Sequence, residues 1–375
     1  MAINFPTPPI YTDPTMGGRV YNSTRGVWEK PRGADTALPL NYIVNPCFQH
    51  SQQNLDVVGT ASAYFMADQW SIRFVSATGT YQASRVAWAT NNKSKYRLRI
   101  YVASANTAPA VGDYLAFAQQ MEGLRVLDFG WSASTGKQML VRFGFYSSIN
   151  GTFTMCIRNG VSNRSYLAPF TVVAGAHSIY SFVVPNDPLG SSLWPIDNTI
   201  GMQFWITLAA STTYGSGVAG WQAGNHLAIA GTTKAYSTGA AIFELFDVGM
   251  YLDPYRTGKL PYWEAPDDQM ELLVCQRYWY RAYVLKGFVS SATGATRMAM
   301  AHPVPMRIAP AAAIVGACRA YDQGAAPAMS SVSANVSTID VCEMNITTVT
   351  GLTAGRACEM PQDGVDVYIA MSARP

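Results

Sequence analysis

The sequence has little charge for its length. Lys, Arg, Asp and Glu make up 13% of its 375 residues, whereas an average soluble chain contains about 25%. A lone soluble monomer usually carries more charge on its surface. We therefore expect an exterior of hydroxyl- and amide-bearing sheet, or one that is largely covered by other subunits.

Long runs of basic residues are also missing, and the formal net charge is only +3. The densest basic stretch is Lys93, Lys95, Arg97 and Arg99, which alternates with other residue types. A period of two places such side chains on one face of a strand, so we expect them to line a solvent-facing strand surface. A phosphate-binding track is not indicated, and no nucleic-acid partner is predicted.

Targeting and membrane signals are lacking as well. The opening MAINFPTPPIYTDP has no basic region followed by an apolar core, so it does not resemble a signal peptide. The longest apolar run, residues 308–318, is shorter than the roughly 20 residues that a membrane-spanning helix needs. The sequence therefore predicts no membrane insertion and no export by the usual route.

Metal and nucleophile motifs do not occur. The six cysteines are spread singly with no C-x-x-C pair, and we expect them to be buried free thiols. The four histidines have no H-x-x-x-H spacing, and no G-x-S-x-G is found. We predict no metal and no cofactor, and a structural calcium near Glu244 or Asp247 stays an alternative.

Residues 1–38 are expected to form an arm rather than a domain, because prolines block both helix and central strand. These prolines are Pro6, Pro8, Pro9, Pro14 and Pro31. Within the arm, residues 19–28 predict a small hairpin. An aromatic arm without a core of its own orders by docking, so we interpret it as an attachment segment. A strap along its own domain is the alternative.

Residues 39–255 read almost entirely as strands. β-Branched and aromatic runs are separated by turn sequences such as Asn150-Gly151 and Asn159-Gly160. The predicted strands include 96–103, 124–133, 138–147, 151–159, 178–185, 201–209 and 241–252, and a short helical turn is expected at 115–121. Many short strands predict an antiparallel jelly-roll β-sandwich, in which residues 41–48 lie near residues 241–252.

Residues 256–375 are expected to form a smaller β-rich domain. A Pro- and Gly-broken connector leads to Asp267 and Asp268, which favour the start of a helix. The helical pattern continues to Gln276 and then gives way to the strand-favouring Tyr278, Trp279 and Tyr280. The fold class is thus all-β, with an extended N-terminal arm.

An ordered series of motifs resembles a widespread family of tailed-bacteriophage virion proteins. The motifs are NPCFQHSQQ from Asn45, YFMADQW ending at Trp70, FAQQMEG, SYLAPFTV, the W-x-x-G-N of residues 221–225, ELLVCQRYWYR and HPVPMRIAP. The opening INFPTPP and its Tyr–Trp hairpin are similar to the attachment segments of phage appendages. This chain lacks the second W-x-x-D-G-x-x-W turn of the fuller form.

The resemblance implies a structural protein of the virion, assembled in the cytoplasm of the host bacterium. Its expected role is a tail or head fibre that contacts other virion proteins through the arm and forms a homotrimer. The arm residues expected to attach are Phe5, Tyr11, Tyr21 and Trp28. A capsid decoration, collar or tail-sheath component that reinforces the particle is the alternative.

A host-surface glycan is the candidate ligand. Aromatic rings stack on the apolar faces of sugars, amides bind their hydroxyls, and loops on a rigid sandwich hold such sites. The residues that fit this description and are expected in loops are Trp194, Tyr214, Trp221, Gln222 and Asn225. Most Trp in a β protein belong to the core, so a structural role for Trp221 is the alternative.

Catalysis is not predicted. Glycan hydrolysis needs two carboxyl groups on either side of one bond, and the available acids lie mostly at turns or in the connector. They are Asp113, Glu122, Asp128, Glu244, Asp247, Asp253, Asp267 and Asp268. A glycan-binding module or depolymerase remains the outside alternative. Arg277, Tyr278 and Trp279 are expected to hold the domain junction or a trimer contact.

Overall fold

The computed structural model describes residues 20–22, 27–29, 40–88, 93–131, 133, 135–189, 193–291, 295–322, 325–348, 351–361, 364 and 366–375. The chain divides into two compact units, Met1–Leu40 and Asn41–Pro375. In the first unit, β1 (Val20–Asn22) and β2 (Val27–Glu29) pair antiparallel with Tyr21 opposite Trp28, which confirms the predicted hairpin. Phe5, Tyr11 and the side chains of Tyr21 and Trp28 lie outside the described residues.

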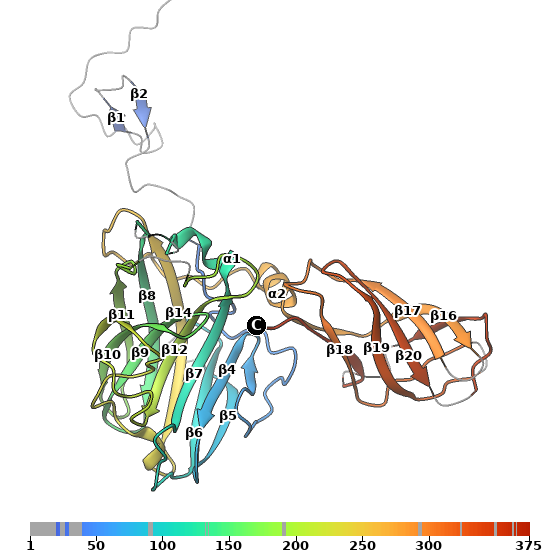
Figure 1. The fold of residues 1–375 in the computed structure, drawn as a ribbon, viewed down its shortest axis with the longest axis horizontal. Coiled ribbons are helices and arrows are strands. Elements are labelled where there is room, and N and C mark those ends of the chain that lie inside the picture. The colour runs from blue at the N-terminus through green and yellow to red at the C-terminus, as the bar shows by residue number, and fades with distance from the viewer. Residues whose placement is uncertain are drawn as a thin grey trace, which may run out of the picture. The chain divides into compact units, whose positions relative to one another are not determined.

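Two antiparallel sheets form the body of the second unit (Figure 1). One sheet has the order β13-β10-β9-β12-β7-β4-β3, and the other has the order β11-β8-β14-β6-β5. The strands are β3 (Phe65–Ala67), β4 (Trp70–Val75), β5 (Thr80–Ala87), β6 (Tyr96–Ser104), β7 (Tyr114–Glu122), β8 (Gln138–Ser147), β9 (Gly151–Asn159), β10 (Arg164–Val172), β11 (His177–Val184), β12 (Ile200–Ala210), β13 (Gly220–Ala223) and β14 (Ile242–Asp253).

The connectivity is that of a jelly roll. Strands β6, β14, β8 and β11 are neighbours in one sheet, and β7, β12, β9 and β10 are neighbours in the other. The chain from β6 to β14 therefore crosses between the sheets as two interleaved Greek keys do. Strands β3, β4, β5 and β13 extend the two sheets. The predicted jelly-roll sandwich is confirmed, and Tyr42 N donates to Met250 O at 2.9 Å, as expected for residues 41–48.

Aromatic rings fill the space between the sheets. Phe143 and Phe145 of β8 contact Phe170 of β10 at ring-centroid distances of 5.2 and 5.4 Å. Trp70 meets Phe204 edge-on at 6.0 Å. Full burial of such a side chain contributes about 1.5–3 kcal/mol, so alternating apolar residues give the body a large core of its own.

Two local predictions in the body were wrong. Residues 115–121 belong to β7, because Leu115 and Phe117 alternate inward between the neighbouring strands β4 and β12. Residues 124–133 are not a strand: they begin in α1 (Gly123–Val126) and η2 (Leu127–Phe129). There the backbone bonds to the 197–199 segment, and a Cβ on Gly123 would lie 2.3 Å from Pro195 O.

The basic residues of β6, Arg97 and Arg99, do not both face solvent as predicted. Arg97 is fully buried, and its Nη1 lies 3.0 Å from Glu244 Oε2 on β14. Arg99, with a third of its side chain exposed, contacts Glu244 Oε1 at 2.5 Å. The rings of Trp88 and Phe246 cover the Arg97 guanidinium. Arg97, which the sequence places at the surface, is therefore one partner of a buried ion pair, because the strand register sets it beside Glu244.

The elements that follow β14 form a second, C-terminal β-rich domain with its own hydrophobic core (Figure 1). Its elements are α2 (Asp268–Gln276), β15 (Trp279–Ala282), β16 (Leu285–Ser291), β17 (Ala295–Ala301), β18 (Ala311–Val315), β19 (Met329–Ser337), β20 (Val341–Thr348), β21 (Ala357–Met360) and β22 (Tyr368–Ser372). The sheets have the orders β15-β22-β18 and β19-β20-β17-β16-β21. Asp267 accepts from Met270 N at 3.0 Å, which confirms the predicted helix start.

Removal of Glu244 should be costly. In Glu244→Ala, Arg97 keeps its buried position without its carboxylate, and loss of one partner of a buried pair typically destabilises by about 3–5 kcal/mol. Urea unfolding of the full chain measures this loss. The matched control is Glu343→Ala, which breaks the exposed Arg297–Glu343 pair and should cost at most about 1 kcal/mol. Equal losses for the two variants would contradict the assignment.

Candidate functional site

Two of the predicted glycan-binding tryptophans meet in an aromatic cluster. Trp194 and Trp221 contact Trp131 edge-on at 5.0 and 5.2 Å, and each other at 5.8 Å. Trp194 is only 4% exposed. Trp221 and Gln222 lie on the edge strand β13 rather than in a loop, which corrects the sequence-based placement of both residues. The cluster therefore packs ring against ring and leaves Trp194 no free face for a sugar.

The indole N–H groups of Trp194 and Trp221 also have hydrogen-bond acceptors. Trp194 Nε1 donates to Asp187 Oδ2 at 3.1 Å, and Trp221 Nε1 donates to Pro185 O at 2.9 Å. Arg164 donates to both Asp187 oxygens. Burial alone would raise the pKa of Asp187, but the hydrogen bonds from Arg164 and Trp194 hold it below its ordinary value. Arg164, Asp187 and Trp131 were not singled out from the sequence.

The other predicted residues are tied to separate partners. Tyr214 packs edge-on against Tyr114 at 5.3 Å, within a small apolar cluster on the outer face of the seven-stranded sheet. Gln222 folds back to Val218, donating to its carbonyl at 2.9 Å. Asn225 is exposed and accepts a hydrogen bond from Arg158. The five residues do not line one recess, and their glycan-binding role stays a prediction.

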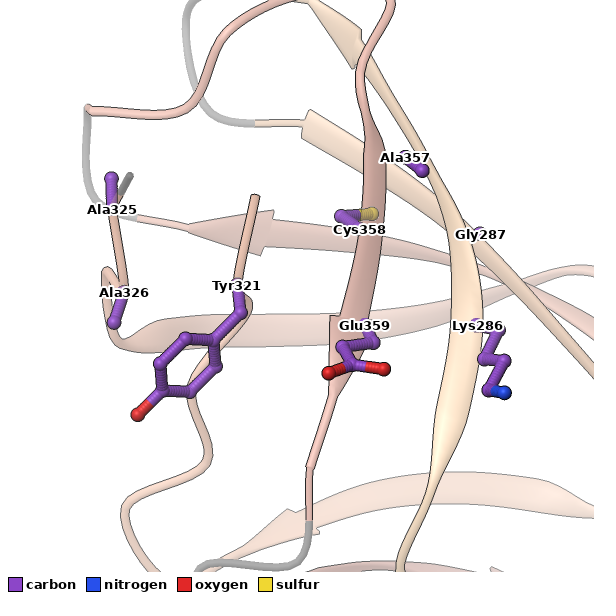
Figure 2. A pocket seen from close by; sticks show the side chains of 8 residues that line it. All are labelled: Lys286, Gly287, Tyr321, Ala325, Ala326, Ala357, Cys358 and Glu359. Atoms are coloured by element: carbon purple, nitrogen blue, oxygen red, sulfur yellow. The ribbon is translucent and has the colours of Figure 1, made fainter. Parts of the chain in front are cut away.

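A recess of about 740 Å³ lies in the C-terminal domain (Figure 2). It is built by β16, by β21 and by Tyr321, Ala325 and Ala326. Its lining residues are Lys286, Gly287, Tyr321, Ala325, Ala326, Ala357, Cys358 and Glu359. Tyr321 is fixed to β21, because Tyr321 N donates to Glu359 O at 2.8 Å and Glu359 N donates to Tyr321 O at 3.0 Å.

Three side chains give the recess its chemistry. Lys286 stands opposite Glu359 in the register of β16 and β21, and Figure 2 shows Tyr321 on the far side of Glu359. Tyr321 is 36% exposed. The arrangement offers a ring face, a carboxylate that only accepts and an ammonium that only donates. No motif marks it in the sequence, since its residues come from three distant segments.

Glycine is required on the wall of the recess. A Cβ on Gly287 would lie 1.8 Å from Arg297 O of the neighbouring β17. The backbone of β16 therefore approaches β17 closely and presents no side chain at this position. Gly287, Ala325, Ala326 and Ala357 are the small residues that line the recess.

The residues predicted to hold a junction contact the body of the same chain. Arg277 donates to both oxygens of Glu122, at 2.7 and 3.1 Å, and Tyr278 OH donates to Glu122 Oε1 at 3.1 Å. Glu122 ends β7 and is buried. Trp279 O accepts from Gln52 Nε2 at 3.0 Å. Whether these residues also contribute to a trimer contact stays a prediction.

Further bonds join the C-terminal domain to the body. Asn45 N donates to Glu271 Oε1 at 2.6 Å, and burial raises the pKa of the Glu271 carboxyl above its ordinary value. Arg374 lies over the ring of Phe65 at 3.7 Å, with Asp68 3.7 Å from its Nη2. Arg307 donates to Ala373 O at 2.6 Å and also reaches Asn198 O. The start and the end of the domain are thus both bonded to the body.

The acids considered for catalysis all have structural partners. Asp113 accepts from Ala77 N and Asn106 Nδ2, Asp128 accepts from Tyr42 OH, and Asp253 accepts from Thr257 N and Gly258 N. Asp247 accepts from the backbone of Lys93 and Ser94, and Asp268 lies 3.4 Å from His50. Glu122, Glu244 and Asp267 are accounted for above. These carboxylates hold loops, caps and strands in place.

Metal ligands do not gather in the described part of the chain. No group of three or more His, Cys, Asp or Glu residues there is arranged to hold an ion. All six cysteines are free and buried, as predicted, and burial raises the pKa of the Cys156 thiol to about 12. Among the described helices, none is long and apolar enough to cross a membrane.

No family model and no curated protein matches this sequence. Among solved structures, the enzymatically active domain of tailspike protein 4 from bacteriophage CBA120 is similar over 57% of this chain and 21% of that one, with 11% identity and a TM-score of 0.30. The chain thus spans about a fifth of the length of that protein.

Carbohydrate-binding modules are similar to a comparable extent. TmCBM61, solved with β-1,4-galactotriose, is 10% identical and matches 57% of this chain and 99% of its own, with a TM-score of 0.27. A CBM4 module is 13% identical, covers 56% and 98% respectively, and has a TM-score of 0.25. Such low identities and scores carry no argument about what this chain binds.

Loss of Arg277 should weaken the junction. Arg277→Ala leaves the buried Glu122 with only the Tyr278 hydroxyl, and a charge-assisted hydrogen bond contributes about 1.5–3 kcal/mol. We expect a loss of that size in denaturant unfolding and faster proteolysis within residues 254–266. Arg297→Ala, which breaks an exposed ion pair, is the matched control. Unchanged unfolding together with unchanged oligomer size by light scattering would contradict a junction role.

The raised pKa of Glu271 makes a pH prediction. A carboxyl that binds its proton more tightly in the folded state contributes stability that is present below its unfolded pKa and is lost as pH rises through its folded pKa. Asp187 and Asp253, with lowered pKa values, act in the opposite direction. The informative quantity is therefore the difference between wild type and Glu271→Gln, which keeps an acceptor for Asn45 N.

We expect the wild-type stability, relative to Glu271→Gln, to increase as pH falls from 7 towards 4.5. Urea unfolding at several pH values measures this difference. A difference that is flat with pH, or that falls on acidification, would show that the buried carboxyl does not have a raised pKa.

Proposed function

We propose that this chain is a non-enzymatic structural protein of a bacteriophage virion, a tail or head fibre that contacts glycans on the host surface. The observation that carries the proposal is the use of its buried charges. The carboxylates of Glu122, Asp187 and Glu244 are each bonded to arginine. Side chains in such fixed pairs stiffen a scaffold and are not available for proton transfer to a substrate.

The continuity of the second unit supports a mechanical role. Residues from the start, middle and end of the C-terminal domain bond to the jelly roll: Arg277 to Glu122, Arg307 to Asn198 and Arg374 to Gln53. Moving one domain relative to the other would break these bonds and leave partly buried charges without partners, which costs free energy. A stiff pair of domains suits an appendage that must keep its shape while it contacts a cell surface.

The division of the chain supports attachment through the N-terminus. The chain divides between Leu40 and Asn41 into two units. In this proposal Phe5, Tyr11, Tyr21 and Trp28 contact another virion protein, and three copies assemble into the appendage. The low proportion of charged residues, 13%, is in keeping with surfaces that are covered in an assembly.

Electron microscopy of intact particles tests the proposal. Gold-labelled antibodies raised against residues 256–375 should mark a small number of projecting structures on phage that encode this chain. Labels spread densely over the shell or the tail tube would instead identify a decoration or sheath component. Full-length Tyr21→Ala/Trp28→Ala should fold with an unchanged melting temperature but fail to join the particle. Normal incorporation of this variant would contradict attachment through the arm.

A further inference from the structure

Resting on the proposed function, we infer that the recess of the C-terminal domain is a saccharide-binding site, which takes an uncharged sugar residue between Tyr321, Glu359 and Lys286. The recess lies outside the tryptophan cluster and outside the loops that the sequence pointed to. Its volume of about 740 Å³ falls within the range of about 300–1,000 Å³ that is usual for small-molecule sites.

The charges of the site favour an uncharged, hydroxyl-rich ligand. Lys286 and Glu359 face each other across neighbouring strands, so the recess carries one positive and one negative group. The two opposite charges cancel, so the recess offers no net electrostatic attraction to an anionic or a cationic sugar. A sugar hydroxyl can donate to the carboxylate or accept from the ammonium. Two neighbouring hydroxyls can therefore satisfy both side chains at once.

The ring of Tyr321 supplies the apolar surface that a sugar also needs. It is 36% exposed, whereas Trp194 in the tryptophan cluster is 4% exposed. An aromatic ring with a polar tip suits a ligand that has both C–H faces and hydroxyls. Next to the ring, Ala325 and Ala326 occupy little volume (Figure 2), which leaves space for the body of the sugar.

The site is held in shape before any ligand arrives. Tyr321 is bonded to β21 through the backbone pair of Tyr321 and Glu359. The buried Asp322 accepts from Thr353 N at 2.5 Å, and Ala320 N donates to Pro327 O at 3.1 Å. Lys286 and Glu359 belong to β16 and β21, which pair with each other. Preorganisation of this kind lowers the entropy that binding must offset.

Saturation-transfer NMR and titration of the full-length protein with a panel of neutral, acidic and basic monosaccharides and their short oligomers test the inference. We expect binding of neutral members only. Tyr321→Ala should weaken binding about tenfold or more, and Ala326→Trp should abolish it by filling the recess. Tyr255→Ala removes the same type of side chain at a more exposed position in the connector, where Tyr255 is 78% exposed, and should leave binding unchanged. Melting temperatures and light scattering establish that each variant is folded.

Several results would overturn the inference. One is binding that survives both Tyr321→Ala and Ala326→Trp, which would place glycan contact elsewhere and leave the proposed function standing. Another is a preference for charged sugars, or no binding to any member of the panel. A third is a change in oligomeric state on Ala326→Trp without sugar binding, which would identify the recess as a seat for another copy. Gold labelling of particles assembled with Tyr321→Ala reports on the virion role separately, because incorporation does not depend on this recess.

Discussion

The contact between the jelly roll and the C-terminal domain depends on the carboxylate of Glu122. Glu122 ends the central strand β7 and receives three hydrogen bonds, two from Arg277 and one from Tyr278. A buried carboxylate is costly unless such donors surround it. Because those donors belong to the segment that follows α2, solvation of one charge requires the C-terminal domain to stay against the jelly roll.

The same solution recurs through the body. Glu244 pairs with Arg97 on the outer face of one sheet, where the rings of Trp88 and Phe246 cover the guanidinium. Asp187 accepts hydrogen bonds from Arg164 and Trp194 at the tryptophan cluster. A chain with few charges has placed several of them inside, where each fixes the position of its partners. The exterior of the described residues includes large apolar side chains such as Val111, Val173 and Leu189.

Prediction from the sequence succeeded where local signals act alone. Alternating apolar residues gave the strands of the sandwich, and Asp267 gave the start of α2. It failed at residues 115–121 and 124–133, where the neighbouring segments determine the outcome. A central position between β4 and β12 makes the first a strand, and backbone bonds to the 197–199 segment bend the second into a helical turn.

The sequence by itself determined the β class and the small hairpin of β1 and β2. Only the tertiary structure decided which polar side chains meet. Strand register and domain packing place Arg97 against Glu244 and Arg277 against Glu122. Register also sets Lys286 opposite Glu359 on neighbouring strands. These partners are far apart along the chain. For the residues on strands, such as Arg97 and Glu244, a shift of one residue in register would turn the side chain to the opposite face. The local sequence pattern therefore does not identify the partner of each side chain.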